Sequence, residues 1–532
     1  MKKRLLSLIL CGLMTASLLV GCATDSEELK KSQQAQNGGN SSQEDSGSQT
    51  ASDTFTIAIN SDTGNTLNPM TDSARFTLMT CNMVYSPLYR MNTDGSIDYI
   101  LAESMEASED GLVYTFKLKE GLKWSDGEPL TAADVVYTYN AENEAYGTFY
   151  IDGQPIQVTN PDDNTVVFTL PSVAANILEM LGNECFILPK HIFENRGSFD
   201  INMLEEEIVG AGPYTLKEYK TGQHLHFVKN PNYVLGEAKT ENVVYKIIEK
   251  DDTAALALQN GDINAWIGAA DTIGPFQNEN YNITNYSEGR VAYLTLNSSS
   301  PKMADKNYRT GILKALNREE IMTAAYTDSE YYVLGYSFLP AENQYYTEDL
   351  EKYEQDVEEA KKLVAGGATE LTIGYVRTDI VQEKMALAVQ AELKAVGINV
   401  TLEGFEQAAA IDIFAETENT PYDIFLGGYV MGIDPYAYAT LFVSDQEGMM
   451  NMIKYDNETI NKLFVEGNAT LDEAARQEIY TQVQQEVAGE AYFYPLGTNL
   501  RTLVTSANVG GIEEAKTVAI YTFSDWSKIT VK

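Results

Sequence analysis

The residues of this chain that could bind a metal are three histidines and four cysteines. His224 and His226 are two residues apart, so on a β-strand their side chains would point to the same side, as two metal ligands must. No cysteine and no further histidine lies near them, so we interpret them as a solvent-facing pair on a strand. His191, which follows a proline and a lysine, is interpreted as a structural or hinge residue. The sequence therefore predicts no metal site.

Sequence patterns of enzymes are absent as well. The chain contains no GxxxxGK[ST] phosphate loop, no GxSxG elbow, no HExxH and no CxxC. The glycine cluster 210–213 is a weak candidate, because Pro213 lacks the amide N–H that a phosphate cradle would use. With 77 Asp and Glu residues, pairing any two carboxylates as a glycosidase acid and nucleophile would be arbitrary. We expect no catalytic residue, no cofactor and no enzymatic activity.

The N-terminus predicts export and lipidation. Positive charges at 2–4 precede an apolar segment of 16 residues at 5–20, shorter than the ~20 residues of a membrane-spanning helix. Residues 19–22, LVGC, resemble a bacterial lipobox, whose cysteine carries diacylglycerol. We expect a lipoprotein signal peptide at 1–21, a lipid anchor on Cys22, and a position on the extracytoplasmic face of a Gram-positive cell membrane. The alternative is an ordinary export signal with a chance cysteine.

The segment behind Cys22 predicts a tether. Residues 24–52 are rich in Ser, Gln, Asn, Gly and Glu and almost free of apolar side chains, so they cannot bury enough surface to offset the entropy of ordering. We therefore expect a flexible tether at 22–53. About 480 residues remain, too many for one hydrophobic core, so two or three subdomains are expected.

The net charge limits which molecules the protein can bind, and the cysteines limit which disulfide it can form. The net charge is −40, and loss of the three positive residues of the signal makes it −43, which excludes nucleic acid as a partner. After export and lipidation only Cys81 and Cys185 could form a disulfide. Cys81 lies in an apolar helical pattern, which favours a buried free thiol.

Hydrophobic periodicity predicts mixed strands and helices. Alternating apolar residues predict strands at 55–59, 113–118 and 165–170, and a helical stripe predicts a helix at 73–85. Two N-terminal capping boxes are expected, Thr131 with Asp134 for a helix at 135–143, and Thr470 with Glu473 for a helix that ends near 487.

The clearest α/β unit lies at 371–402. A strand at 371–376 precedes a helix with one apolar stripe, Gly397 stands where a helix end requires positive φ, and a strand follows at 398–402. A strand, a crossover helix and a strand predict a parallel pair covered by helices.

Motifs along residues 54–530 are similar, in the same order, to those of a known family. The most specific are LAESME at 101–106, EDGLVYTF at 109–116 and GLKWSDGEPLTAADVV at 121–136. They are followed by VGAGPY at 209–214, KNPNY at 229–233, YLTLN at 293–297, ALNRE at 315–319 and GYVMGIDP at 428–435. The chain resembles the extracellular solute-binding proteins of family 5, the peptide and nickel importer family, in its oligopeptide- and dipeptide-binding type.

This resemblance implies an α/β, two-lobed periplasmic-binding-protein-like fold of type II, in the large cluster with an extra β-rich subdomain in lobe I. The expected parts are lobe I at 54–85, 208–293 and 491–532, the inserted β-rich subdomain at 86–207, and lobe II at 294–490. Crossings near 290–297 and 491–496 are expected to form a hinge that closes around the ligand.

The resemblance also implies the function of a receptor for an ABC importer. The expected partners are an oligopeptide, held extended through main-chain hydrogen bonds, and the permease subunits in the membrane, with the receptor itself a monomer. Relatives that carry oligosaccharides, nickel chelates or haem leave those cargoes as alternatives. A sensory or adhesive surface lipoprotein without a permease is a further alternative.

The family pattern predicts which residues contact the ligand. Seven are expected: Tyr429, Met431 and Asp434 on the lobe II wall, Ser73 and Arg75 on lobe I, and Tyr492 and Tyr494 at the crossover. The family's aspartate that holds a peptide amine is missing, so Asp434 either substitutes for it or caps the turn before Pro435. Arg75 either pairs with a ligand carboxylate or offsets Asp72.

Overall fold

The computed structural model of the chain describes residues 53–63, 68–69, 74–182, 185–194, 208–407, 409–410, 413, 420–444 and 455–532. The signal peptide, Cys22, the tether up to residue 52, and Ser73 lie outside these residues. Within them, no helix combines the length and the apolar character that crossing a bilayer requires.

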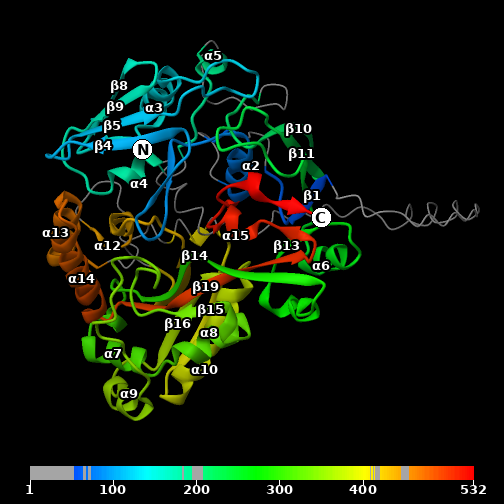
Figure 1. Cartoon of the computed structure of the whole chain (residues 1–532). Helices are drawn as coiled ribbons and strands as arrows, with labels where there is room; N and C mark the ends of the chain where they lie inside the picture. Colours follow the sequence, from blue (N-terminus) through cyan, green and yellow to red (C-terminus); the bar gives the residue numbers. More distant parts are fainter. Residues whose placement is uncertain are drawn as a thin grey trace, which may run out of the picture.

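One 11-stranded sheet runs through both halves of the molecule (Figure 1). Its order is β10-β11-β12-β1-β13-β19-β14-β18-β16-β17, with β15 paired to β19. In the first half the strands are β1 (Thr54–Ile59), β10 (Tyr214–Lys220), β11 (His224–Lys229), β12 (Asn242–Ile247) and β13 (Ala265–Gly268). The helices of this half are α2 (Arg75–Val84) and α6 (Asp251–Gln259), and the C-terminal segment adds β20 (Val509–Gly510), α15 (Ile512–Ala515), β21 (Thr517–Val518), β22 (Thr522–Phe523) and β23 (Thr530–Val531). We call this half lobe I.

The other half, lobe II, continues the same sheet. Its strands are β15 (Tyr332–Leu334), β16 (Glu370–Val376), β17 (Asn399–Phe405) and β18 (Ile424–Tyr429), together with parts of β14 (Tyr281–Leu296) and β19 (Phe493–Ser506). Its helices are α7 (Lys306–Lys314), α8 (Arg318–Tyr326), α9 (Val357–Val364), α10 (Ile380–Ala395), α12 (Ala439–Phe442), α13 (Glu458–Ala469) and α14 (Glu473–Gly489). Two buried apolar clusters pack in lobe II, and one of them extends into lobe I around Leu258 and Trp266.

A separate four-stranded antiparallel sheet lies within the segment expected to be inserted in lobe I. Its order is β4-β5-β9-β8, and β5 pairs with both β4 and β9. The bounds are β4 (Ala102–Ala107), β5 (Val113–Leu118), β8 (Gln157–Asp162) and β9 (Thr165–Thr169), with α3 (Ala132–Tyr146), α4 (Ile177–Gly182), α5 (Lys190–Phe193) and the short strands β2 (Tyr89–Met91), β3 (Ile97–Tyr99), β6 (Tyr150–Ile151) and β7 (Gln154–Pro155). This segment buries its own apolar cluster around Trp124 and Phe116. We call it the inserted subdomain.

Several local predictions are confirmed. The helix expected at 73–85 is α2, and the unit at 371–402 is a parallel β16–β17 pair joined by α10, with Gly397 at φ +89°. The capping box of Thr131 and Asp134 opens α3. Cys81 and Cys185 are both buried free thiols.

The second capping box is wrong. Helix α14 begins at Glu473, and its N-cap is Asp472, whose side chain accepts from the backbone N–H of Ala475. Thr470 instead follows the preceding helix, and its hydroxyl donates to the carbonyl of Glu466. An aspartate two residues later caps the helix in place of the threonine, because aspartate is at least as good an N-cap residue.

The packing of α10 against α8 makes stability depend on pH. Glu392 on α10 accepts from the backbone N–H of Asn317 at 2.9 Å, and burial raises the pKa of its carboxyl to about 7, with nearby Glu320 adding to the shift. The folded chain therefore binds this proton more tightly than the unfolded chain, and stability falls as pH rises from about 4.5 through 7. We expect Glu392→Gln, which keeps an acceptor oxygen, to be more stable than wild type at pH 8 by roughly 1–3 kcal/mol. Urea unfolding at pH 5 and pH 8 checks this, and an equal difference at both pH values would contradict it.

Candidate ligand-binding site

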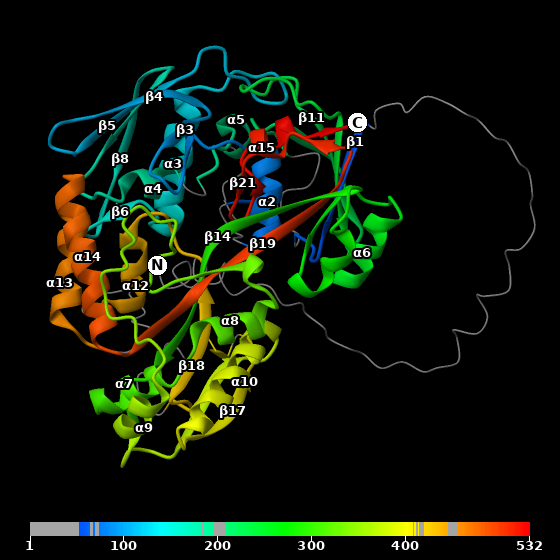
Figure 2. The ribbon, with the colours of Figure 1, turned by 60° about the horizontal axis from the view of Figure 1, so that its bottom comes forward.

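Two long strands connect the lobes. β14 and β19 run side by side from lobe I into lobe II (Figure 2). Residues 281–287 of β14 pair with 500–506 of β19, and residues 291–295 pair with 493–498. The register shifts between Ser287 and Val291 and again between Ala292 and Tyr293. An irregular pair of strands is where two rigid halves can bend relative to each other. The first shift begins just before the expected crossing at 290–297.

A buried cluster of charges lies beside this register shift. Glu288 on β14 is 5% exposed, and its carboxylate accepts from Arg75 at 2.5 Å and 3.0 Å. Arg501 on β19 lies 3.7 Å from the same carboxylate, and the backbone N–H of Ile520 donates to it at 3.3 Å. Burial would raise the pKa of Glu288, but the charges of Arg75 and Arg501 outweigh it and lower that pKa to about 2. Arg75 therefore has a protein carboxylate as its partner, beside the register shift of β14.

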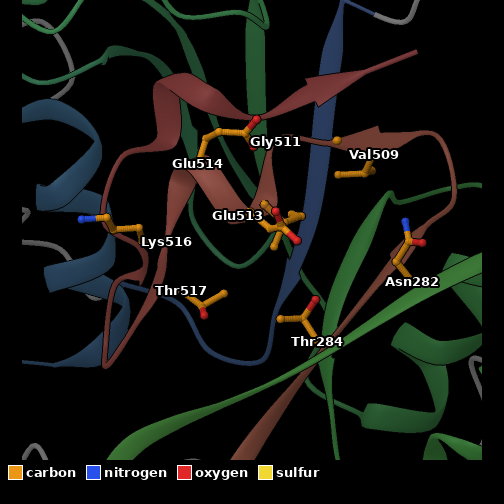
Figure 3. Close-up of a pocket in the computed structure, with 10 residues that line it drawn as sticks. Asn282, Thr284, Val509, Gly511, Glu513, Glu514, Lys516 and Thr517 are labelled. Atoms are coloured by element: carbon orange, nitrogen blue, oxygen red, sulfur yellow. The ribbon is translucent and has the colours of Figure 1, made fainter. Parts of the chain in front are cut away.

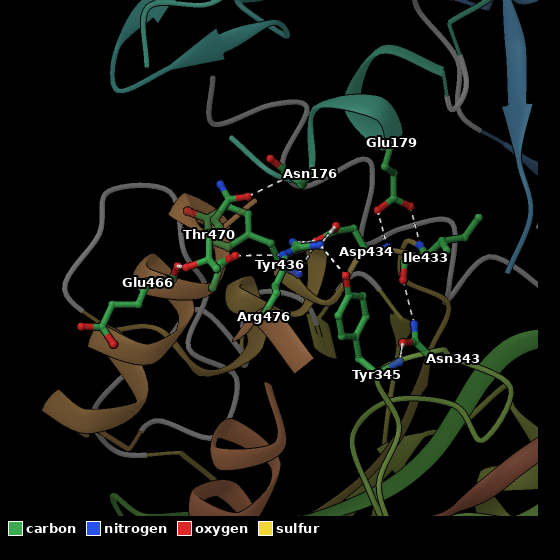
Figure 4. Close-up of polar contacts among 12 residues, drawn as sticks. Asn176, Glu179, Asn343, Tyr345, Ile433, Asp434, Tyr436, Glu466, Thr470 and Arg476 are labelled. Atoms are coloured by element: carbon green, nitrogen blue, oxygen red, sulfur yellow. Dashed lines mark hydrogen bonds and ion pairs between the residues drawn. The ribbon is translucent and has the colours of Figure 1, made fainter. Parts of the chain in front are cut away.

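Asp434 also has a protein partner. Both of its carboxylate oxygens accept from the guanidinium of Arg476 at 2.7 Å, and the two side chains are 4% and 6% exposed (Figure 4). Asp434 also caps the short helix 435–438 by accepting from the backbone N–H of Tyr436. Burial opposes the charge of Arg476, but the bonds to Asp434 dominate and raise the guanidinium pKa above its ordinary value. The carboxylate thus has a structural role, and its contact with a ligand stays a prediction.

The aromatic residues expected at the site lie in the lobe II core. Tyr429 is 5% exposed, and its hydroxyl donates to the carbonyl of Phe338 at 2.7 Å. The rings of Tyr492 and Tyr494 are covered by the guanidinium groups of Arg309 and Arg318, at 3.7 Å and 3.9 Å from the ring centres.

The structure does not gather the predicted residues into one cluster. Met431 is half-buried against the same apolar cluster as Tyr429, whereas Tyr492 and Tyr494 pack in a second cluster, which extends from lobe II into lobe I. Arg75 lies on lobe I, and Ser73 is outside the described residues. The assignment of these seven residues to a ligand site therefore stays a prediction.

Sequence reasoning missed a residue that joins the two lobes. Glu179 on α4 of the inserted subdomain accepts from the backbone N–H of Ile433, and its other oxygen accepts from the backbone N–H of Asp434 at 2.6 Å (Figure 4). The residues in contact are 254 and 255 positions apart in sequence. No local sequence pattern predicts that Glu179 contacts lobe II, since one glutamate in a short helix is ordinary. Its role is recognised only from its position opposite the GYVMGIDP motif in the folded chain.

A surface cavity of about 750 Å³ lies elsewhere, on lobe I (Figure 3). Asn282 and Thr284 of β14 form one side, and residues 509–514 with Lys516 and Thr517 form the other. None of the six predicted ligand-binding residues that the structure describes lines it.

The histidines have protein neighbours in lobe I and the inserted subdomain. Ring nitrogens of His191, His224 and His226 lie 2.9 Å, 3.2 Å and 2.8 Å from side-chain oxygens of Asp126, Glu218 and Asn242. Over the described part of the chain, no group of three or more His, Cys, Asp or Glu residues is arranged to hold a metal ion.

Comparison with known proteins gives consistent matches along most of the chain. Residues 97–449 match the bacterial extracellular solute-binding proteins, family 5 middle region. The oligopeptide-binding protein AppA of Bacillus subtilis (strain 168) is 26% identical over 472 residues, which cover 84% of this chain and 86% of that protein. The nickel-binding periplasmic protein of Escherichia coli (strain K12) is 26% identical over 470 residues, which cover 82% and 87%.

A solved structure agrees with these matches. The crystal structure of the ABC transporter substrate binding protein CtaP (Lmo0135) from Listeria monocytogenes superposes with a TM-score of 0.85 at 36% identity, over 91% of this chain and 100% of that chain. The resemblance, the two-lobed α/β fold and the family match therefore agree, and the chain belongs to the bacterial extracellular solute-binding proteins of family 5.

Proposed function

We propose that this protein is the receptor of an ABC importer that captures oligopeptides between its lobes and delivers them to a membrane permease. The lobes close by bending at the β14–β19 crossing, and the ligand favours the closed form because it contacts both lobes only there. A peptide held extended through its main chain would be bound with little regard to its sequence.

The observation that carries this proposal is the near full-length match to an oligopeptide-binding protein. The fold agrees with it, because the paired strands β14 and β19 connect two lobes. The family consists of solute-binding receptors and not of enzymes, which agrees with the absence of catalytic patterns in the sequence. The domain boundaries and the seven ligand-contact residues are part of the proposal.

Native mass spectrometry of the protein purified from its own cells tests the cargo. Retained masses that fragment as peptides would support the proposal, and small-angle scattering with the same peptides should then show a smaller radius of gyration. A retained sugar, nickel chelate or haem would overturn the peptide assignment while leaving the receptor role. A protein that binds none of these and has no permease encoded beside it would favour the sensory or adhesive alternative.

Nickel is the alternative with a specific observation behind it, namely the relative named as a nickel-binding protein. The three histidines lie at His191, His224 and His226, all on the lobe I side of the chain. A nickel ion bound directly by lobe II would therefore lack imidazole ligands, which that metal favours. Peptide remains the cargo that we propose.

The anchor is proposed on Cys22, from the lipobox and the tether that follows it. We expect Cys22→Ala to release the protein from the membrane into the medium, because no acyl chain then holds the mature chain at the bilayer. Detergent partition measures this, and ligand binding should be unchanged. Full membrane retention of the variant would contradict the anchor, and Cys81→Ala, which removes a buried thiol, is the matched control.

A further inference from the structure

We propose that Glu179 is a positioning residue that latches the inserted subdomain onto lobe II when the protein closes. This inference rests on the proposed function as a closing receptor. The carboxylate accepts from two consecutive backbone N–H groups, those of Ile433 and Asp434, and so uses both of its oxygens across the lobe boundary (Figure 4). A carboxylate that receives two amide donors forms charge-assisted bonds, which are stronger than neutral ones.

Side chains of lobe II also hold the receiving loop in place. The side-chain amide of Asn343 donates to the carbonyl of Ile433 at 2.7 Å, which orients the loop. Arg476 pairs with the carboxylate of Asp434 through two bonds of 2.7 Å, so the negative charge next to the two N–H groups is balanced. A second carboxylate, from Glu179, can therefore approach without facing an unpaired like charge. In this proposal, the lobe II contacts keep the two donors in place before the lobes meet.

Two further hydrogen bonds join the inserted subdomain to lobe II near Glu179. The backbone N–H groups of Ala175 and Asn176 donate to the carbonyl and side-chain oxygens of Asn468 at 2.7 Å and 3.1 Å. Gly432 lies so close to the Glu179 carboxylate that any Cβ at this position would overlap it. The loop thus needs glycine at 432 for the latch to engage, although its own backbone there does not require a left-handed conformation.

The latch affects the equilibrium between the open and closed forms, and therefore the affinity for every solute and not for one in particular. A residue that favours the closed form raises the apparent affinity for every ligand of that form by the same factor. Loss of two charge-assisted bonds should weaken closure by about ten- to a hundredfold. A residue that touched the solute would instead affect some solutes more than others.

The test measures lobe separation without any ligand. Spin labels at Glu109→Cys on the inserted subdomain and Lys462→Cys on α13 report the distance by double electron–electron resonance, in a Cys22→Ala background, since Cys81 and Cys185 are buried. We expect Glu179→Ala and the isosteric Glu179→Gln to shift the distance distribution toward longer distances. Glu144→Ala, which removes an exposed carboxylate from α3 of the same subdomain, is the matched control and should leave the distribution unchanged.

A double-mutant cycle separates the latch from general damage. Gly432→Ala should open the protein by itself, because the new methyl group displaces the Glu179 carboxylate, but it should add little in the Glu179→Ala background. Additive effects of the two changes would overturn the latch. Thermal unfolding shows that each variant is folded, and Glu179→Gln remains informative should the alanine variant be unstable.

Affinity is the second readout. With penta-alanine and pentaglycine as probes, Glu179→Ala should raise both dissociation constants by the same factor, up to about a hundredfold. Unchanged lobe distances in all Glu179 variants would overturn the latch even if peptides bind well. A wild-type protein that binds neither peptide would count against the proposed cargo alone, because the ligand-free distances still decide the role of Glu179.

Discussion

Replacing Arg476 with methionine should destabilise lobe II by about 3–5 kcal/mol, because it leaves the carboxylate of Asp434 buried without its counter-charge. The two side chains are 6% and 4% exposed, so water cannot take the place of the guanidinium. Methionine keeps most of the apolar stem, which limits the cavity. Urea unfolding of wild type and variant measures the loss.

A matched control is available on the neighbouring helix. Lys462→Met on α13 removes a cation whose partner Glu466 is 3.4 Å away, but this pair is 72% and 46% exposed. Exposed pairs contribute about 0–1 kcal/mol, so this variant should differ little from wild type. Equal losses for Arg476→Met and Lys462→Met would contradict the buried pair.

The same pair leads to a prediction about the role of Asp434 toward ligands. Because both oxygens accept from Arg476, we expect Asp434→Asn to weaken the binding of free and N-acetylated peptides equally. An aspartate that held a peptide amine would instead cost free peptides about ten- to a hundredfold more than acetylated ones. Calorimetry with penta-alanine and its N-acetylated form measures the difference, and a selective loss would assign the amine contact to Asp434.

Glu288→Gln should destabilise the protein at pH 7 by a similar amount, about 3–5 kcal/mol, since it removes the buried carboxylate that pairs with Arg75 and lies 3.7 Å from Arg501. The pKa of Glu288 is lowered from 4.5 to about 2, so the unfolded chain binds the proton more readily than the folded chain. The stabilisation is therefore complete above about pH 4.5 and is lost as pH falls through 2. This group alone should remove roughly 3 kcal/mol of wild-type stability over that window.

The difference between wild type and Glu288→Gln isolates this group from the other carboxylates. Unfolding midpoints in urea at pH 7, 4 and 2.5 should show the difference shrinking as pH falls. Glu106→Gln, a change of an exposed glutamate on β4, should show no difference at any pH. A difference for Glu288→Gln that is constant with pH would contradict the lowered pKa.

The sequence by itself determined the local elements and the family. Periodicity located α2 and the β16–α10–β17 unit, and Gly397 marked the end of α10, because these signals depend on residues within one or two turns of each other. The N-cap of α14 was predicted wrongly, since Thr470 and Asp472 both suit an N-cap and the structure uses the aspartate.

Only the tertiary structure decided which side chains pack in the core and which contact the other lobe. Every residue of β18 is buried, so alternation along that strand could not tell which face holds Tyr429. The partners that fix each role come from far along the chain: Phe338 for Tyr429 is 91 residues away, Arg476 for Asp434 is 42, and Glu179 for Ile433 is 254. The role of a charged or aromatic side chain depends on the group that it bonds or packs against. The sequence contains both groups, but only the folded chain brings them into contact.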